Sequence, residues 1–464
     1  MHANGVLLPY GPEPTECPPE RLISLPFLLL RAFTAAGAVA TGLVQTFVFA
    51  RVLTPERFSI FIVVGAIGYT LWFADLGFAK IVFVNLRAAY LAGRRDQRAA
   101  RDATAVIAAY VLLAVAASLV CVAVRAAQPS IALSDGVELG LFLLYVTLNL
   151  AWFSLRTVSI AVDLYIFYET LELARRVIVV AMMLAMLAGQ PVMTFLIGAN
   201  ALWGVLLVAA AVKLARRGAL AARLDGLARE LIAFFRLNAR SIARSSTSAL
   251  SGVFVAIFPY YFVPLAFGLG AAPIILEVTF RIFRGASVIY SAACDLTIPG
   301  QTRALTRRDA GRLIRTTLLA VGLSSLPAVS GCIVLIFAAG PLFQFLLRSA
   351  ATMPPQLTPI LLALLLFNVV QVVSETLLQH TGYFRSLARV GVLVAATTVL
   401  ATALCVAAKL GIVGFLAAYT IVFAGGALCL AAAAIMGPIR AATMKPGAKQ
   451  PARALFRFLQ AALQ

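Results

Sequence analysis

The sequence predicts an all-α polytopic membrane protein with about twelve transmembrane helices, in two pseudo-symmetric six-helix bundles around a central cavity. Three observations support this fold class. Hydrophobic residues make up 62% of the 464 residues, whereas soluble domains are about half apolar. These residues come in blocks of about 20, the length of a helix that spans the hydrocarbon core. The period-2 alternation of a membrane β-barrel is absent, and backbone in lipid must otherwise be helical.

Twelve apolar blocks form the expected membrane spans, numbered here in chain order. They cover residues 24–50, 58–79, 103–124, 137–158, 171–188, 192–212, 244–266, 272–298, 316–339, 355–379, 388–408 and 412–436. The fifth block is the weakest, because its continuous apolar part runs only from Val177 to Gly189.

The basic residues lie mainly on one side of these spans. With a cytosolic N-terminus, 30 of the 38 Lys and Arg fall in the tails and in the loops after even-numbered spans, including Arg156, Arg175 and Arg176 after span 4. Five fall in loops on the other side and three within spans. The positive-inside rule therefore predicts a bacterial inner-membrane protein with both termini cytosolic. Anionic lipid headgroups account for the net charge of +20 without nucleic acid.

The chain divides into two related halves. We expect a disordered cytosolic tail over 1–23, an N-terminal lobe over 24–212, a cytosolic linker over 213–243, a C-terminal lobe over 244–436 and a basic tail over 437–464. The linker has helical period, which fits an amphipathic helix at the membrane interface or a solvated helix. Residues 94–96 and 307–309 both read RRD, after the second span of each half. Two halves of the same orientation imply a cavity between them.

Several function classes find no support in the residues. The chain has two histidines, and none of its six cysteines forms a CxxC pair, so we expect no metal site, disulfide or cofactor. No segment resembles a P-loop, a nucleophile elbow or paired catalytic carboxylates. The predicted loops on the outer side are short and leave little room for an active site. We therefore expect a transporter and not an enzyme.

Residues 29–79 carry a family resemblance. The first span ends in ARVLTPERF, which is similar to a turn of the form "aRxLtpexfG", with Ser59 where that pattern has Gly. The second span ends in ADLGF, similar to "aDlG", and the segment from Asp163 to Arg176 (DLYIFYETLELARR) adds to the match. With these motifs and its two-lobe layout, the chain resembles the polysaccharide or oligosaccharide flippase family of the multidrug/oligosaccharidyl-lipid/polysaccharide (MOP) exporter superfamily.

That resemblance implies a V-shaped pair of six-helix bundles that work by alternating access. It also implies an undecaprenyl-diphosphate-linked oligosaccharide as cargo, flipped for lipopolysaccharide or other exopolysaccharide biosynthesis. Membrane lipids and a polysaccharide polymerase are the further expected partners. The alternative is a small-molecule, multidrug-type exporter of the same superfamily. Such an exporter would favour acidic residues at mid-membrane in the first half, whereas the mid-membrane charges here are mainly arginines.

Three charged residues inside span 8 are the first candidates for cargo binding. Glu277, Arg281 and Arg284 stand at i, i+4 and i+7 and therefore share one helix face. A charge buried in the bilayer is costly, so this face is expected to meet protein or water. Two guanidiniums suit the bidentate binding of a diphosphate or an acidic sugar. The trio either lines the cavity or forms only a buried ion pair.

Arg31, Gln371 and Glu375 are further candidates for the cavity. Arg31 lies about seven residues into span 1, where it either lines the cytosolic mouth of the cavity or snorkels to headgroups. Gln371 and Glu375 share a face near the inner end of span 10. That face is either a polar cavity wall or an ordinary interfacial surface.

Arg51, Glu56 and Arg57 flank the turn between the first two spans. These charges form either an outer gate or a solvated loop, and the sequence favours neither reading.

Overall fold

The computed structural model describes residues 25–71, 78–91, 96–127, 133–221, 226–306, 309–348, 351–381 and 383–443. Helices joined by short turns make up these residues, with no strand among them, which confirms the all-α prediction. The predicted tail over 1–23, residues 444–464 of the basic tail and most of the two RRD motifs lie outside the described residues.

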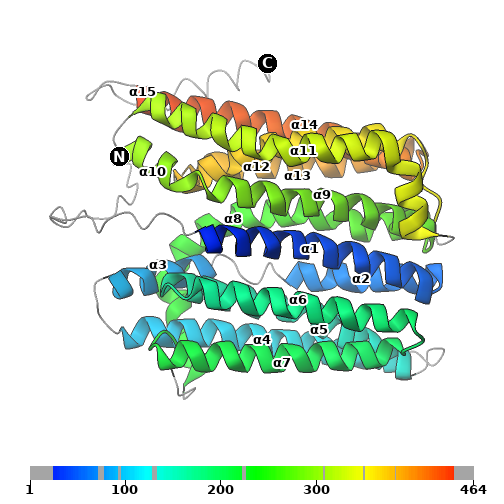
Figure 1. The fold of residues 1–464 in the computed structure, drawn as a ribbon, viewed down its shortest axis with the longest axis horizontal. Helices are drawn as coiled ribbons and strands as arrows, with labels where there is room; N and C mark the ends of the chain where they lie inside the picture. Colours follow the sequence, from blue (N-terminus) through cyan, green and yellow to red (C-terminus); the bar gives the residue numbers. More distant parts are fainter. Residues whose placement is uncertain are drawn as a thin grey trace.

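Within the described residues, seven helices form the first bundle, which lies in the lower half of Figure 1. They are α1 (Leu25–Val52), α2 (Pro55–Thr70), α3 (Phe78–Leu91), α4 (Gln97–Ala126), α5 (Leu133–Ala161), α6 (Tyr165–Leu187) and α7 (Val192–Arg216).

Most of the second bundle lies in the upper half of Figure 1, whereas the start of α8 (Leu227–Phe267) crosses the first bundle. The second bundle contains α8, α9 (Ala271–Asp295), α10 (Ile298–Thr306), α11 (Ala310–Leu347), α12 (Leu357–His380), α13 (Phe384–Ala407) and α14 (Ile412–Ala434). A π-helical turn (Ile435–Ile439) and α15 (Arg440–Thr443) follow.

The two bundles repeat one packing pattern, which confirms their predicted pseudo-symmetry. In the first bundle α1 packs on α6, α2 and α4 pack on α5, and α7 packs on α5 and α6. In the second, α8 packs on α13, α9 and α11 pack on α12, and α14 packs on α12 and α13. The bundles meet where α1 contacts α9 and α11, and where α2 contacts α8 and α9. Helix α1 is therefore shared between the two halves.

Nine helices of the described residues are long and apolar enough to cross a membrane. Helices α2, α6 and α9 are not among them. Helix α2 has 16 residues, fewer than the roughly 20 of a typical span. Helices α6 and α9 carry the charged clusters described below. The predicted count of twelve spans therefore stays a prediction.

Three helix boundaries differ from the predicted spans for identifiable reasons. Helix α2 ends at Thr70, so the predicted span over 58–79 is not one described helix. Helix α6 begins at Tyr165, six residues before the predicted span, because its charged residues pair with one another. Helix α8 runs from Leu227 to Phe267 without a break, so the helix predicted in the linker is continuous with the seventh span.

The turn between α1 and α2 follows directly from the sequence. Thr54 caps α2, since its hydroxyl accepts a 3.3 Å hydrogen bond from the backbone N–H of Arg57. Pro55 fills the first helical position, where no backbone donor is needed. This tight reversal places Arg51 at one end of the bundles. We call it the Arg51 end. The opposite end, where α1 begins and α9 ends, is the Arg31 end (Figure 1).

Candidate functional site

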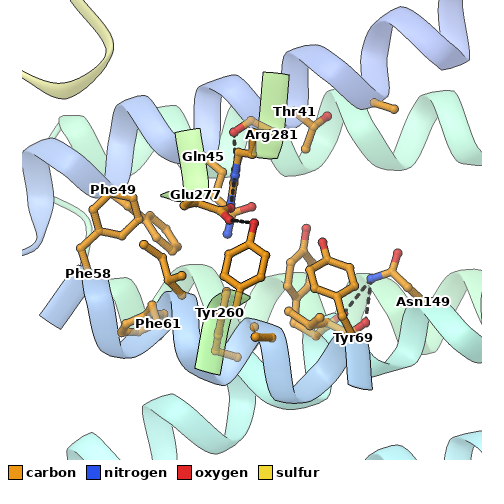
Figure 2. Close-up of a pocket in the computed structure, with 18 of the residues that line it drawn as sticks. Thr41, Gln45, Phe49, Phe58, Phe61, Tyr69, Asn149, Tyr260, Glu277 and Arg281 are labelled. Atoms are coloured by element: carbon orange, nitrogen blue, oxygen red, sulfur yellow. Dashed lines mark hydrogen bonds and ion pairs between the residues drawn. The ribbon is translucent and has the colours of Figure 1, made fainter. Parts of the chain in front are cut away.

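A cavity of about 330 Å³ lies between the bundles. Its walls come from α1, α2, α5 and α6 of the first bundle and from α8 and α9 of the second. Figure 2 shows Glu277 and Arg281 of α9 beside Tyr260 of α8, facing Gln45 of α1. A cavity that both bundles share changes shape whenever the bundles move relative to each other.

The carboxylate of Glu277 is the centre of the α9 cluster. Its side chain is buried and both oxygens are bonded. Oε1 accepts a hydrogen bond from Arg281 Nε. Oε2 accepts from Tyr260 Oη at 2.6 Å and from Arg284 Nη2 at 3.1 Å. The structure thus brings together the three charged residues that the sequence places on one face of span 8.

Both arginines of the α9 cluster also reach the first bundle. Arg281 Nη1 donates to the backbone carbonyl of Gly42 on α1. The Arg284 guanidinium lies 5.2 Å from the ring centre of Tyr69 on α2, within the range of a cation–π contact. Arg281 lines the cavity, whereas Arg284 supports its wall. The α9 cluster is therefore an inter-bundle contact as well as an ion pair.

A second charged cluster, which was not predicted from the sequence, lies on α6. Glu172 is buried and accepts from Arg175 Nε at 2.8 Å and from Arg175 Nη2 at 2.7 Å. Arg176 Nη2 pairs with Glu172 Oε1, the oxygen that Arg175 Nη2 also contacts. Trp152 Nε1 donates to Glu172 Oε2 at 2.8 Å. Arg175 and Arg176 both line the cavity. Their predicted place in a cytosolic loop is wrong, because α6 begins ten residues before Arg175.

The two α6 arginines have different surroundings. Arg175 is held on Trp203, with its guanidinium 4.4 Å from the ring centre. The Arg176 side chain is 20% exposed and its buried Nε has no hydrogen-bond partner among the described residues. Gly37 of α1 leaves room for it, since a Cβ there would lie 3.3 Å from Arg176 Cδ. Arg175 is therefore fixed on both sides, whereas Arg176 is partly exposed beside the cavity.

Aromatic side chains line the part of the cavity that lies toward the Arg51 end. Phe49, Phe58 and Phe61 lie on one side in Figure 2, and Tyr69 and Asn149 lie on the other side of Tyr260. The rings of Phe49 and Phe61 pack edge to face, with centroids 5.5 Å apart. The cavity thus combines a cationic wall with an apolar, rigid wall toward the Arg51 end.

The charge of the cavity wall is positive. Its described lining includes the guanidiniums of Arg175, Arg176 and Arg281 and one carboxylate, that of Glu277. That carboxylate is already bonded to two arginines, and Glu172 behind the wall is bonded to two more. Four guanidiniums therefore surround two carboxylates, which leaves a net charge that attracts anions.

Arg31 lies outside the cavity, at the Arg31 end. Its Nη1 donates to Glu169 Oε1 of α6 at 3.2 Å, and its Nη2 lies 3.6 Å from Asp295 Oδ2 of α9. The guanidinium therefore stands between one carboxylate from each bundle.

The three charges near the α1–α2 turn have separate roles. Arg51 crosses to the second bundle, where it donates to the carbonyls of Phe345 at 2.5 Å and Leu346 at 3.2 Å. Arg57 stays within the first bundle and pairs with α5. Glu56 is exposed. The structure thus brings only Arg51 of this predicted gate to the other bundle.

Gln371 and Glu375 line a different cavity, which lies inside the second bundle. It has a volume of about 80 Å³ and walls from α8, α12, α13 and α14. Glu375 Oε1 accepts from Gln379 Nε2 at 2.8 Å. The structure therefore separates these two residues from the arginines between the bundles. Among the described residues, no three His, Cys, Asp or Glu side chains are placed to hold a metal ion.

Comparisons with known proteins identify relatives by fold. No family model and no curated protein sequence matches the chain. Among solved structures, an inward-facing multidrug resistance MATE transporter of the MOP superfamily is 13% identical, with a TM-score of 0.64 over 91% of this chain and 100% of the other. An outward-facing structure of such a transporter is 12% identical, with a TM-score of 0.55 over 90% and 97%.

A third solved structure is a MOP superfamily transporter from Pyrococcus furiosus, described as having a binding pocket of reversed polarity. It is 12% identical, with a TM-score of 0.60 over 90% of this chain and 95% of the other. At such identities, the comparisons show that the chain has the fold of MOP superfamily transporters.

Proposed function

We propose that this protein moves a polyprenyl-diphosphate-linked oligosaccharide across the cytoplasmic membrane by alternating access, for cell-surface polysaccharide assembly. One observation carries the proposal: the cavity between the bundles is lined by Arg175, Arg176 and Arg281, and its described lining has a single carboxylate that is already paired. A diphosphate is the anionic part of such a cargo, and arginine binds phosphate oxygens bidentately.

The size of the cavity supports binding of a headgroup. Small-molecule sites commonly have volumes of about 300–1,000 Å³, and about 330 Å³ is near the lower limit. A diphosphate with its first sugar suits this space, whereas a whole oligosaccharide needs the bundles to separate further. Tyr69, which lines the cavity and is 38% exposed, offers a flat ring against which a sugar can lie.

The fold supports a transporter and not an enzyme, working between states open to opposite sides. At the Arg31 end the bundles are joined by a loose contact, the 3.6 Å pair of Arg31 with Asp295. With the orientation that the basic residues predict, this end faces the cytosol, where lipid-linked sugars are assembled. Membrane lipids and a polysaccharide polymerase remain the expected partners.

A small-molecule exporter is the second candidate, because the neighbours by fold include multidrug transporters. For a cationic drug we would expect an acidic residue on the first-bundle wall. The described lining from α1, α2, α5 and α6 contains none. A small-molecule exporter with this cavity would therefore be best suited to transport anionic compounds.

The deciding experiment measures lipid-linked oligosaccharide in a strain that lacks the gene. The strain is complemented with the wild type, with Arg176→Gln plus Arg281→Gln, or with Arg216→Gln plus Arg217→Gln as a matched control at exposed positions outside the cavity. We expect undecaprenyl-linked units to accumulate in the deletion strain and in the double variant, with the control behaving as the wild type. If the deletion leaves lipid-linked intermediates and surface polysaccharide unchanged, the flippase proposal fails and the exporter becomes the working hypothesis.

A further inference from the structure

Arg31 stands between two carboxylates that differ in accessibility. Glu169 on α6 is buried, with a side chain 4% exposed. Asp295, the last residue of α9, has a side chain 50% exposed. The Arg31–Glu169 distance of 3.2 Å allows a hydrogen bond, whereas the 3.6 Å separation from Asp295 does not meet hydrogen-bond geometry. Arg31 is therefore firmly held by its own bundle and loosely held by the other.

Arg156 of α5 strengthens the firm side. Its Nε lies 3.6 Å from the Glu169 oxygen that Arg31 contacts. The second oxygen of Glu169 is buried and has no hydrogen-bond partner among the described residues. Two guanidiniums around one buried carboxylate leave an excess of positive charge. An additional anion near Arg31 is thus electrostatically favoured, and Asp295 now supplies it.

We infer that Asp295 is a built-in competitor for the phosphate of the entering cargo, and that its displacement from Arg31 separates the bundles at this end. The inference rests on the proposed function, since it assumes a diphosphate cargo. A diphosphate carries more negative charge than one carboxylate and offers two oxygens to the planar guanidinium. An exposed ion pair without hydrogen-bond geometry is weak and easily replaced. Glu169 keeps Arg31 in place while Asp295 leaves.

The contacts at the other end differ in kind. Arg51 donates to two backbone carbonyls of α11. Ser59 Oγ donates to the carbonyl of Gly270 at 2.9 Å and accepts from its N–H at 3.0 Å. The α11 and Gly270 partners are backbone groups, and the carbonyls that Arg51 binds offer no anion for a phosphate to replace. A diphosphate should therefore open the Arg31 end and leave the Arg51 end closed.

The test measures the distance between spin labels on the two bundles. A variant with its native cysteines replaced carries Ile166→Cys at the start of α6 and Ile314→Cys near the start of α11, both at exposed positions. The protein is placed in phosphatidylcholine nanodiscs and titrated with farnesyl diphosphate. Inorganic pyrophosphate and farnesol serve as separate arms, so that a lipid-linked and a free diphosphate are distinguished. Binding of radiolabelled farnesyl diphosphate is measured in parallel.

We expect farnesyl diphosphate, but not farnesol, to increase the population with the longer distance. In Asp295→Asn that population should be larger without ligand, and the half-maximal concentration should fall about threefold to tenfold, because less of the protein is in the occluded state. Arg31→Gln should bind weakly and show no distance response. Glu56→Gln, exposed at the opposite end, should match the wild type. A response to pyrophosphate alone would also support the inference and would identify the phosphates as sufficient.

Two outcomes would overturn the inference, and they have different meanings. If Asp295→Asn and the wild type bind and open at the same concentration, Asp295 does not compete, although the proposed cargo stands. If neither diphosphate binds to any of the proteins, the inference fails together with the proposed diphosphate cargo.

Discussion

The charged clusters on α6 and α9 use the same chemistry in different settings. Each holds a buried glutamate between two arginines of its own helix. On α6 the further partners, Trp152 and Trp203, belong to the same bundle. On α9, Arg281 reaches Gly42 of the opposite bundle. Relative motion of the bundles would keep the bonds of both glutamates and break the contacts that Arg281 and Arg284 make with Gly42 and Tyr69. We therefore expect Glu172 and its bonds to contribute mainly to stability, with Arg175 and Arg176 still facing the cargo, and the α9 cluster to contribute to the transport step as well.

The largest effect is expected from removing either glutamate charge. Glu172→Gln leaves the buried Arg175 and the half-buried Arg176 without their counter-charge, which should lower the free energy of unfolding by about 3–5 kcal/mol. Glu277→Gln should cost a similar amount and should also abolish transport by the molecules that remain folded. Stability is measured by denaturant titration in mild detergent and transport in proteoliposomes, normalised to folded protein.

Glu56→Gln is the control, because an exposed site should change stability by no more than about 0.5 kcal/mol. The distinction between the clusters would be lost if Glu172→Gln impaired transport per folded molecule as strongly as Glu277→Gln.

The next effect comes from replacing an arginine with lysine. Arg281→Lys keeps the charge but cannot bond both Glu277 and the Gly42 carbonyl in the same fork geometry. A hydrogen bond to a charged group contributes about 1.5–3 kcal/mol, so transport should fall about tenfold to hundredfold. Arg175→Lys should lower the melting temperature of the protein and leave most of its transport rate. The opposite ranking in a paired thermal-melt and transport assay would show that the α6 cluster is the moving one.

A smaller effect is expected from removing one neutral donor at each carboxylate. Tyr260→Phe removes the hydroxyl that donates to Glu277 and accepts from Arg284. Trp152→Phe removes the indole N–H that donates to Glu172. Each should cost about 1–2 kcal/mol, with Tyr260→Phe acting on the transport rate and Trp152→Phe on the melting temperature. Equal effects of the two variants on transport would argue against separate roles.

The smallest effect is expected from two glycines of α1. A Cβ at position 37 would lie 3.3 Å from Arg176 Cδ, whereas one at position 42 would meet Arg281 at an ordinary 3.9 Å. Gly37→Ala should displace Arg176 and cost up to about 1 kcal/mol despite the better helix propensity of alanine. Gly42→Ala should be neutral or slightly stabilising. Thermal melts compare the pair directly, and a greater loss with Gly42→Ala would contradict the observed packing.

The fold class and one of the two charged clusters, that on α9, could be predicted from the sequence. Hydrophobic blocks of span length are enough to predict an all-helical bundle, because lipid offers no hydrogen-bond partners and the backbone must satisfy its polar groups within each helix. The α9 trio was visible because its charges interrupt an apolar block at helical spacing. Arg175 and Arg176 were assigned to a loop, since they stand near the start of the least hydrophobic block. A longer helical reading from Tyr165 would have placed Glu172 beside both arginines.

Other features leave no trace in a single sequence. The partners of Arg51 are backbone carbonyls, which every residue possesses, so no pattern identifies them. Gln371 and Glu375 share a helix face, but sequence spacing does not reveal which of two cavities that face lines. The pairing of Arg31 with Glu169 and Asp295 joins residues far apart in the chain and depends on how the bundles meet.

The spacing within each cluster has a consequence for biogenesis. A helix with an arginine at its centre costs about 2.5–3.5 kcal/mol for each such residue to insert into the bilayer. In α6 and α9, glutamate and arginine stand three or four residues apart and pair within one helix. Their charges can thus be partly neutralised as soon as the helix forms, before any neighbouring helix has arrived. Each of these segments can leave the translocon as one locally paired unit, and moving a single arginine by two positions should impair insertion even where the final packing tolerates it.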